Sequence, residues 1–201
     1  MVTRFADAAV KHGIDIFRVF DSLNYLPNLQ LGIDAAGSAG GVVEAAMCYT
    51  GDVCRSAGTD GYKYTVEYYL RLARSLVESG AHVLAVKDMS GVLTPAAASK
   101  IIGALRAEFS SLPIHVHTHD TAATGVASMA AAVSAGADVV DGAIDAFSGS
   151  TSQPALGGIV SSLAGTAGAT ELDLRSLGAL SEYWEDVRGV YAPFESGQFA
   201  G

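Results

Sequence analysis

The chain has 201 residues, and its 12 Lys and Arg against 21 Asp and Glu give a formal net charge of −9. This length suits one hydrophobic core, so we predict a single domain over residues 1–201. The negative charge argues against nucleic acid or an anionic membrane surface as a partner. No apolar run approaches the roughly 20 residues that cross a bilayer. Two cysteines make no disulfide framework, which favours a reducing compartment.

Four times along the chain, a helical pattern ends at a glycine and a short apolar run follows. These glycines are Gly13, Gly40, Gly80 and Gly136. Glycine is the usual residue in the left-handed position that ends a helix. The pattern therefore predicts a first helix, about five βα units and a last helix near 177–191. We expect strands near residues 14–20, 41–46, 81–86, 113–119 and 137–140.

Strands that alternate with helices predict a parallel sheet, which closes in one of two ways. A doubly wound open sheet would be complete with five strands. An eightfold barrel usually takes about 250 residues, so it would lack strands here. Polar residues inside the expected strands suit a barrel interior better than a packed helix layer; they are Arg18, Glu44, Lys87, His115 and His117. We therefore predict an α/β fold that is a partial TIM barrel of about five parallel βα units, with an inward-facing ion pair between Arg18 and Glu44.

The motif His117-Thr118-His119 ends one of these strands. Strand periodicity places both imidazoles on one face. Two neutral imidazoles placed in this way can chelate one divalent cation. Histidines that only hydrogen-bond to their neighbours are the alternative, but the spacing, followed by Asp120, favours a metal.

Lys87 ends the preceding strand, and a bare ammonium next to a dication would be repelled. Three states of Lys87 are open. It forms an ion pair with Asp88 or another carboxylate, it is a deprotonated amine that acts as a base or Schiff-base former, or it carries CO₂ as a carbamate that serves as a ligand. From the pattern alone, the ion pair is the default.

Residues 151–154, Thr-Ser-Gln-Pro, follow the last expected strand. We expect them to open a helix, with Ser150 or Thr151 as the N-cap and Pro154 in the first turn. Their hydroxyls and backbone N–H groups could also face a carboxylate or carbonyl of a substrate.

Five segments, taken in this order, resemble the carboxyltransferase domain of the pyruvate carboxylases. The tandem histidine motif alone is shared with hydroxymethylglutaryl-CoA lyase and isopropylmalate synthase, whereas Lys87-Asp88-Met89-x-Gly91 is similar to biotin-dependent carboxyltransferases. The resemblance covers nearly the whole chain. Its segments are Phe-Arg-Val-Phe-Asp-Ser-Leu-Asn at 17–24, residues 41–52, residues 87–91, His-Val-His-Thr-His-Asp-Thr at 115–121, and residues 151–154.

This resemblance implies a TIM barrel and a divalent metal, Zn²⁺ or Mn²⁺. By motif, Lys87 as N6-carboxylysine, His117 and His119 match three metal ligands of the family. The fourth, an aspartate in an Arg-Asp motif, has no matching segment here. Biotin is the second implied cofactor, carried on a domain that this sequence does not contain.

The implied reaction is the transfer of a carboxyl group from carboxybiotin to pyruvate, through a metal-stabilised enolate, to give oxaloacetate. The implied partners are pyruvate or oxaloacetate and the biotin carboxyl carrier domain of a homotetrameric ligase. The implied location is the cytoplasm, or the mitochondrial matrix in a eukaryote. The family's pyruvate-binding arginine and proton-shuttle threonine match no position, so we expect the chain alone to be inactive. The alternatives are a non-catalytic truncated fragment, an oxaloacetate decarboxylase α subunit and a transcarboxylase.

Overall fold

The computed structural model describes residues 1–51, 53–54 and 62–195, so Asp52 of the second matched segment lies outside the described residues. Helix and strand alternate from the first helix to the fifth strand, as predicted. The strands are β1 (Ile16–Phe20), β2 (Val42–Cys48), β3 (Val83–Asp88), β4 (Ile114–Thr118) and β5 (Val139–Val140). The α-helices are α1 (Val2–Lys11), α2 (Leu26–Ser38), α3 (Val66–Glu78), α4 (Pro95–Glu108), α5 (Gly125–Ser134), α6 (Leu156–Leu163) and α7 (Leu174–Tyr191). Two short 3₁₀ helices are η1 (Asp145–Phe147) and η2 (Ala192–Phe194).

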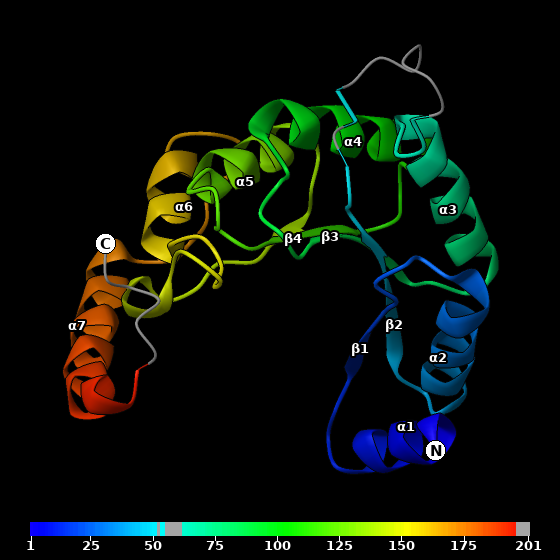
Figure 1. Ribbon diagram of the computed structural model, residues 1–201, viewed down its shortest axis with the longest axis horizontal. Helices are drawn as coiled ribbons and strands as arrows, with labels where there is room; N and C mark the ends of the chain where they lie inside the picture. Colours follow the sequence, from blue (N-terminus) through cyan, green and yellow to red (C-terminus); the bar gives the residue numbers. More distant parts are fainter. Residues whose placement is uncertain (52, 55–61, 196–201) are drawn as a thin grey trace.

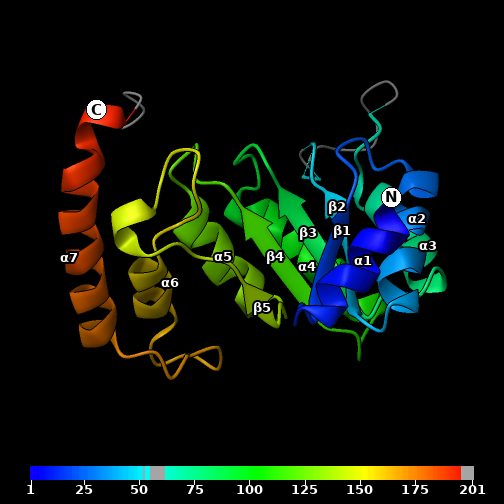
Figure 2. The ribbon, with the colours of Figure 1, turned by 90° about the horizontal axis from the view of Figure 1, so that it is seen from below.

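The strand order distinguishes between the two closures. The five strands are parallel and lie in the order β1-β2-β3-β4-β5, each beside its neighbour in the chain. In a doubly wound sheet, the strand order reverses part-way across the sheet and helices cover both faces. The strand order of this sheet does not reverse. Instead the sheet curves, and helices α2, α3, α4 and α5 cover its convex side (Figure 1). Helix α7 lies beyond α6, at one end of the molecule (Figure 2). The prediction of a partial barrel is confirmed.

The hydrophobic core lies between the convex face of the sheet and the helices. Alternate residues of the central strands point into it, such as Ala45 and Met47 of β2 and Val86 of β3, all fully buried. Helices α2 and α4 cover them with apolar side chains such as Leu29 and Ile101. The intervening residues of each strand therefore face the concave side, where the helices do not reach.

Local signals place most element ends. The four glycines of the repeat have φ between 90° and 106°, which confirms their role in ending helices. At the other helix ends, Thr65 and Thr94 accept hydrogen bonds from backbone N–H groups of the first turns of α3 and α4. None of the helices among the described residues has the length and apolar character to span a membrane.

The segment 150–154 departs from the predicted helix start. Helix α6 begins only at Leu156, and no side chain caps it in the expected way. The backbone of Gly149 instead exchanges hydrogen bonds with Gln153 and Ser152, both 2.9 Å long, which closes a tight turn. The Asp145 carboxylate accepts from Gly157 N at 2.9 Å, within the first turn of α6. An acceptor distant in the chain therefore takes the role assigned to the local hydroxyls.

The side chain of Asn24 ties the β1–α2 turn to the end of β2. Its Oδ1 accepts from Cys48 N at 2.8 Å and its Nδ2 donates to Cys48 O at 2.9 Å, while its own φ is 54°. We expect Asn24→Ala to lower the free energy of unfolding by about 1–3 kcal/mol, because the buried Cys48 N–H loses its acceptor. Urea unfolding measures this loss, with the exposed Gln30→Ala as control. Equal stabilities of the two variants would contradict this role of Asn24.

Candidate functional site

Polar side chains gather on the concave face of the sheet, on the side opposite the core. Arg18 pairs in register with Glu44, and Lys87 pairs with His117. In parallel strands, residues in register point to the same face. The strands therefore bring both pairs to one side of the sheet.

The predicted ion pair of Arg18 and Glu44 is present. Arg18 Nε donates to Glu44 Oε1, and the Glu44 side chain is only 6% exposed. Two residues complete what we call the charge cluster, made up of Arg18, Glu44, His115 and Asp141. Arg18 Nη1 donates to Asp141 Oδ2 at 3.0 Å, and His115 lies between the carboxylates, 2.8 Å from Glu44 Oε2 and 2.7 Å from Asp141 Oδ1.

The charge cluster is electrically balanced. Both ring nitrogens of His115 face carboxylate oxygens, so both donate and the ring is an imidazolium. Burial lowers the pKa of His115, but the hydrogen bonds to Asp141 and Glu44 outweigh burial and raise it to about 9. For Asp141, burial acts in the opposite direction and raises the pKa. Hydrogen bonds from His115 and His117 outweigh burial and hold the pKa of Asp141 well below its usual range. Two cations thus face two anions at neutral pH.

The two predicted histidine ligands are each anchored through Nδ1. His117 Nδ1 lies 2.7 Å from Asp141 Oδ2, and His119 Nδ1 lies 2.5 Å from the carbonyl oxygen of Thr151. These oxygens only accept, so each Nδ1 carries a proton, and in the neutral ring Nε2 then has the lone pair. His117 Nε2 is buried without a hydrogen-bond partner in the described structure. The ring centroids are 5.3 Å apart, so the strand brings the two imidazoles together.

Lys87 lies on the same concave face. Its Nζ is 5.0 Å from the ring centroid of Phe20 on β1. Burial, and secondarily the charge of Arg18, lowers the pKa of the Lys87 amine. Within the described part of the chain, no carboxylate forms an ion pair with Lys87.

The default ion pair of Lys87 with Asp88 is therefore wrong. Asp88 alternates to the core side of the sheet, where it is fully buried. Its carboxylate accepts from Leu93 N at 2.7 Å, Ser90 N at 3.1 Å and Thr118 Oγ1 at 2.8 Å. Asp88 thus builds the turn after β3 and joins the ends of β3 and β4.

Among the described residues, no three His, Cys, Asp or Glu side chains are arranged to hold a metal ion. The imidazoles of His117 and His119 therefore need donors of another kind, or donors from elsewhere, to complete a coordination shell. An unmodified Lys87 ammonium is not such a donor.

Asp141 belongs to this site, although the sequence patterns did not predict it. It follows the two-residue strand β5, whose Val139 pairs in register with His115. The same register continued by two residues brings Asp141 to His117. Period-two spacing from Val139 was the available signal, but so short a strand gave no alternation from which to assign a face.

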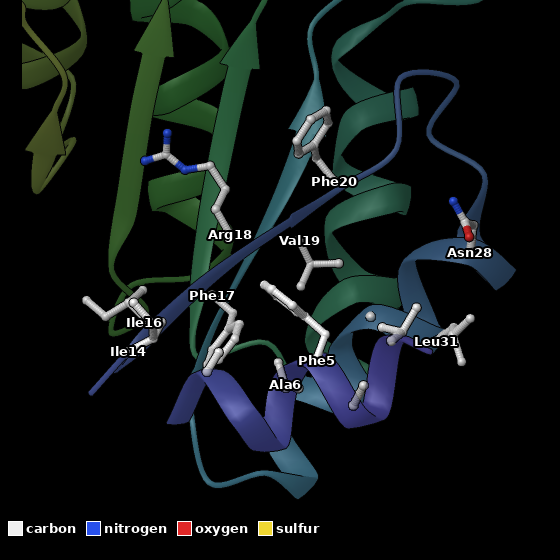
Figure 3. A pocket seen from close by; sticks show the side chains of 15 residues that line it. Phe5, Ala6, Ile14, Ile16, Phe17, Arg18, Val19, Phe20, Asn28 and Leu31 are labelled. Carbon is white, nitrogen blue, oxygen red and sulfur yellow. The ribbon is translucent and has the colours of Figure 1, made fainter. Parts of the chain in front are cut away.

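An apolar pocket of about 450 Å³ lies elsewhere, between α1, β1 and α2. Figure 3 shows Phe5, Phe17 and Val19 gathered in it. It contains neither histidine of the β4 motif, and the only polar side chains among its lining residues belong to Arg18 and Asn28. The pocket thus borders the polar face through Arg18 and Phe20, but none of the three predicted metal ligands lines it.

The chain is similar to proteins of a known family. The HMGL-like family model matches residues 3–183. The chain belongs to the HMGL-like family. It is 56% identical over 195 residues to pyruvate carboxylase 1 of Caenorhabditis elegans, covering 97% of this chain and 16% of that protein. It is 52% identical to the mitochondrial pyruvate carboxylase of Homo sapiens, with the same coverage.

A solved structure of a pyruvate carboxylase domain has a fold similar to that of this chain. The fold matches the carboxyl transferase domain from Rhizobium etli pyruvate carboxylase, solved with pyruvate and biocytin, with a TM-score of 0.91 and 49% identity. The match covers 98% of this chain and 32% of that one. The resemblance to pyruvate carboxylase carboxyltransferase domains is confirmed, and the oxaloacetate decarboxylase and transcarboxylase alternatives are not favoured. This HMGL-like chain spans 16% of the length of its curated relatives.

Proposed function

We propose that this HMGL-like chain forms part of the carboxyltransferase site of a biotin-dependent pyruvate carboxylase. Lys87 as N6-carboxylysine, His117 and His119 would hold a divalent ion, Zn²⁺ or Mn²⁺. The observation that carries the proposal is the buried, unpartnered Nε2 of His117. A buried imidazole nitrogen with no partner is costly in a metal-free protein, and it is the atom that a metal would bind.

The state of Lys87 follows from the same site chemistry. Its amine lies on the same face of the sheet as His117 and has no carboxylate partner among the described residues. Addition of CO₂ to the neutral amine forms an N–C bond, releases one proton and leaves an anionic carbamate. This exchange replaces a repelled cation by an oxygen ligand, which removes the conflict between Lys87 and the metal.

The chain's own groups have separate tasks in this proposal. The Thr151 carbonyl and the Asp141 carboxylate orient the two imidazoles. When bound, the ion supplies Lewis-acid polarisation of the pyruvate carbonyl and stabilisation of the enolate. The biotin carboxyl carrier domain of the proposed homotetrameric parent would deliver the carboxyl group, in the cytoplasm or, in a eukaryote, the mitochondrial matrix.

Metal binding by the full 201-residue chain tests the proposal. We expect Zn²⁺ or Mn²⁺ to bind with one-to-one stoichiometry in calorimetry, and His117→Ala with His119→Ala to weaken binding by more than about 100-fold. His12→Ala, at the end of α1, is the matched control and should bind normally. Native mass spectrometry should detect one added CO₂ that Lys87→Ala loses. Equal metal affinity in the double variant and the control would refute the site.

A further inference from the structure

We propose that Asp141 is a positioning residue that holds His117 in the tautomer with the proton on Nδ1 and the lone pair on Nε2. The inference deepens the proposed metal site and rests on it for its functional meaning. The tautomer itself is a property of the metal-free chain, so it is measured without any metal.

Two neighbours compete for His117 Nδ1. The Asp141 carboxylate oxygen, 2.7 Å away, accepts a hydrogen bond and so requires a proton on Nδ1. Arg18 Nη1, 3.4 Å away, is a donor and would require a lone pair there. Hydrogen bonds of N–H groups are strongest near 2.9 Å and are weak at 3.4 Å. The carboxylate therefore sets the tautomer as long as it is in place.

The Asp141 carboxylate is itself held on several sides. Its Oδ1 accepts from His115 Nε2 at 2.7 Å, and its Oδ2 accepts from Arg18 Nη1 at 3.0 Å. Its backbone N–H donates to Val116 O at 3.1 Å, which fixes the residue beside β4. These contacts come from two strands, so the carboxylate cannot turn away from His117 without breaking them.

Without the Asp141 carboxylate, Arg18 would determine which nitrogen of His117 carries the proton. In Asp141→Ala, Arg18 is the remaining polar neighbour of His117 Nδ1 among the contacts that the structure shows. A donor at that position favours a lone pair on Nδ1 and moves the proton to Nε2. The atom that is now buried and unpartnered would then carry a hydrogen and could no longer bind a metal.

The asparagine variant is a sharp control. In Asp141→Asn, Arg18 and His117 both require an acceptor at the position of Oδ2, whereas only His115 requires one at Oδ1. The amide oxygen is therefore held at Oδ2, and the amide nitrogen donates to a neutral His115 that has given up its Nε2 proton. The same oxygen continues to accept from His117. We therefore expect Asp141→Asn to keep the original tautomer even though it loses the negative charge.

Long-range ¹H–¹⁵N spectra of ¹⁵N-histidine-labelled, metal-free chain report the tautomer directly. We expect Nδ1–H at His117 in the unsubstituted chain and in Asp141→Asn, and Nε2–H in Asp141→Ala. If the alanine variant lacks a cooperative thermal transition, Asp141→Leu fills the site with an apolar side chain of similar length and carries the same prediction. A proton that stays on Nδ1 in the folded apolar variant overturns the inference.

Zinc titration separates this inference from the proposed function. We expect Asp141→Ala to bind Zn²⁺ about 10–100-fold more weakly, as is typical when a partner of a ligating histidine is lost, and Asp141→Asn to bind close to normally. A tautomer switch in a chain that binds no zinc would support Asp141 as the positioning residue and refute the metal site. Normal zinc binding by the unsubstituted chain, with no tautomer switch in Asp141→Ala, would support the metal site and overturn Asp141 as the positioning residue.

Discussion

Glu44→Ala is expected to lower the free energy of unfolding by about 3–5 kcal/mol, the cost of breaking a buried ion pair from one side. The Glu44 carboxylate is 6% exposed and accepts from both Arg18 and His115. Without it, the two cations of the charge cluster, Arg18 and His115, have only Asp141 to balance them. Urea unfolding monitored by circular dichroism measures the loss. Glu67→Ala, which removes an exposed partner of Arg74 on α3, should cost at most about 1 kcal/mol.

A double variant tests the electrostatic explanation. Arg18→Met and Glu44→Leu together remove one charge of each sign and leave His115 facing Asp141, so the cluster stays balanced. We expect the double variant to lose less stability than the sum of the two single variants, because residues within one network couple. Additive losses would show that the charge balance of the cluster does not stabilise the fold.

Gly91→Ala is expected to cost about 2–4 kcal/mol, combining the left-handed backbone with a collision. Gly91 has φ of 70°, and an added Cβ would lie 2.8 Å from His119 O and 2.9 Å from Thr121 N. These are backbone atoms that cannot swing aside. His119 N also donates to Asp88 O at 3.0 Å, so movement there displaces the imidazole relative to β3.

Gly80→Ala is the matched control for this collision. Gly80 precedes β3 at its other end with φ of 98°, and an added Cβ there meets nothing within 4 Å. We expect only the left-handed backbone cost of about 1–2 kcal/mol, with unchanged zinc binding. Thermal unfolding and zinc titration of both variants give the comparison. A loss in Gly91→Ala no larger than in Gly80→Ala would mean that the β3–α4 turn yields to the extra carbon.

Short-range patterns in the sequence were sufficient for most of the architecture. A glycine that ends a helix and a strand that alternates faces are properties of a few neighbouring residues, so they can be read without a structure. Such patterns predicted all five strands and the shared face of His117 and His119. The ion pair of Arg18 and Glu44 was also predictable, because it joins consecutive strands in the same register.

The rest depends on contacts between distant parts of the chain. Asp141 meets His117 only because β5 pairs beside β4, and the Thr151 carbonyl meets His119 only because a tight turn replaces the expected helix start. Asp88 points to the core side, away from Lys87, because neighbouring residues of a strand face opposite sides of the sheet. Backbone N–H groups on that side donate hydrogen bonds to its carboxylate. No local periodicity encodes which acceptor reaches which imidazole nitrogen. The register and curvature of the sheet decide which acceptor each imidazole nitrogen meets. They bring Asp141 to Nδ1 of His117 and leave its Nε2 without a hydrogen-bond partner among the described residues.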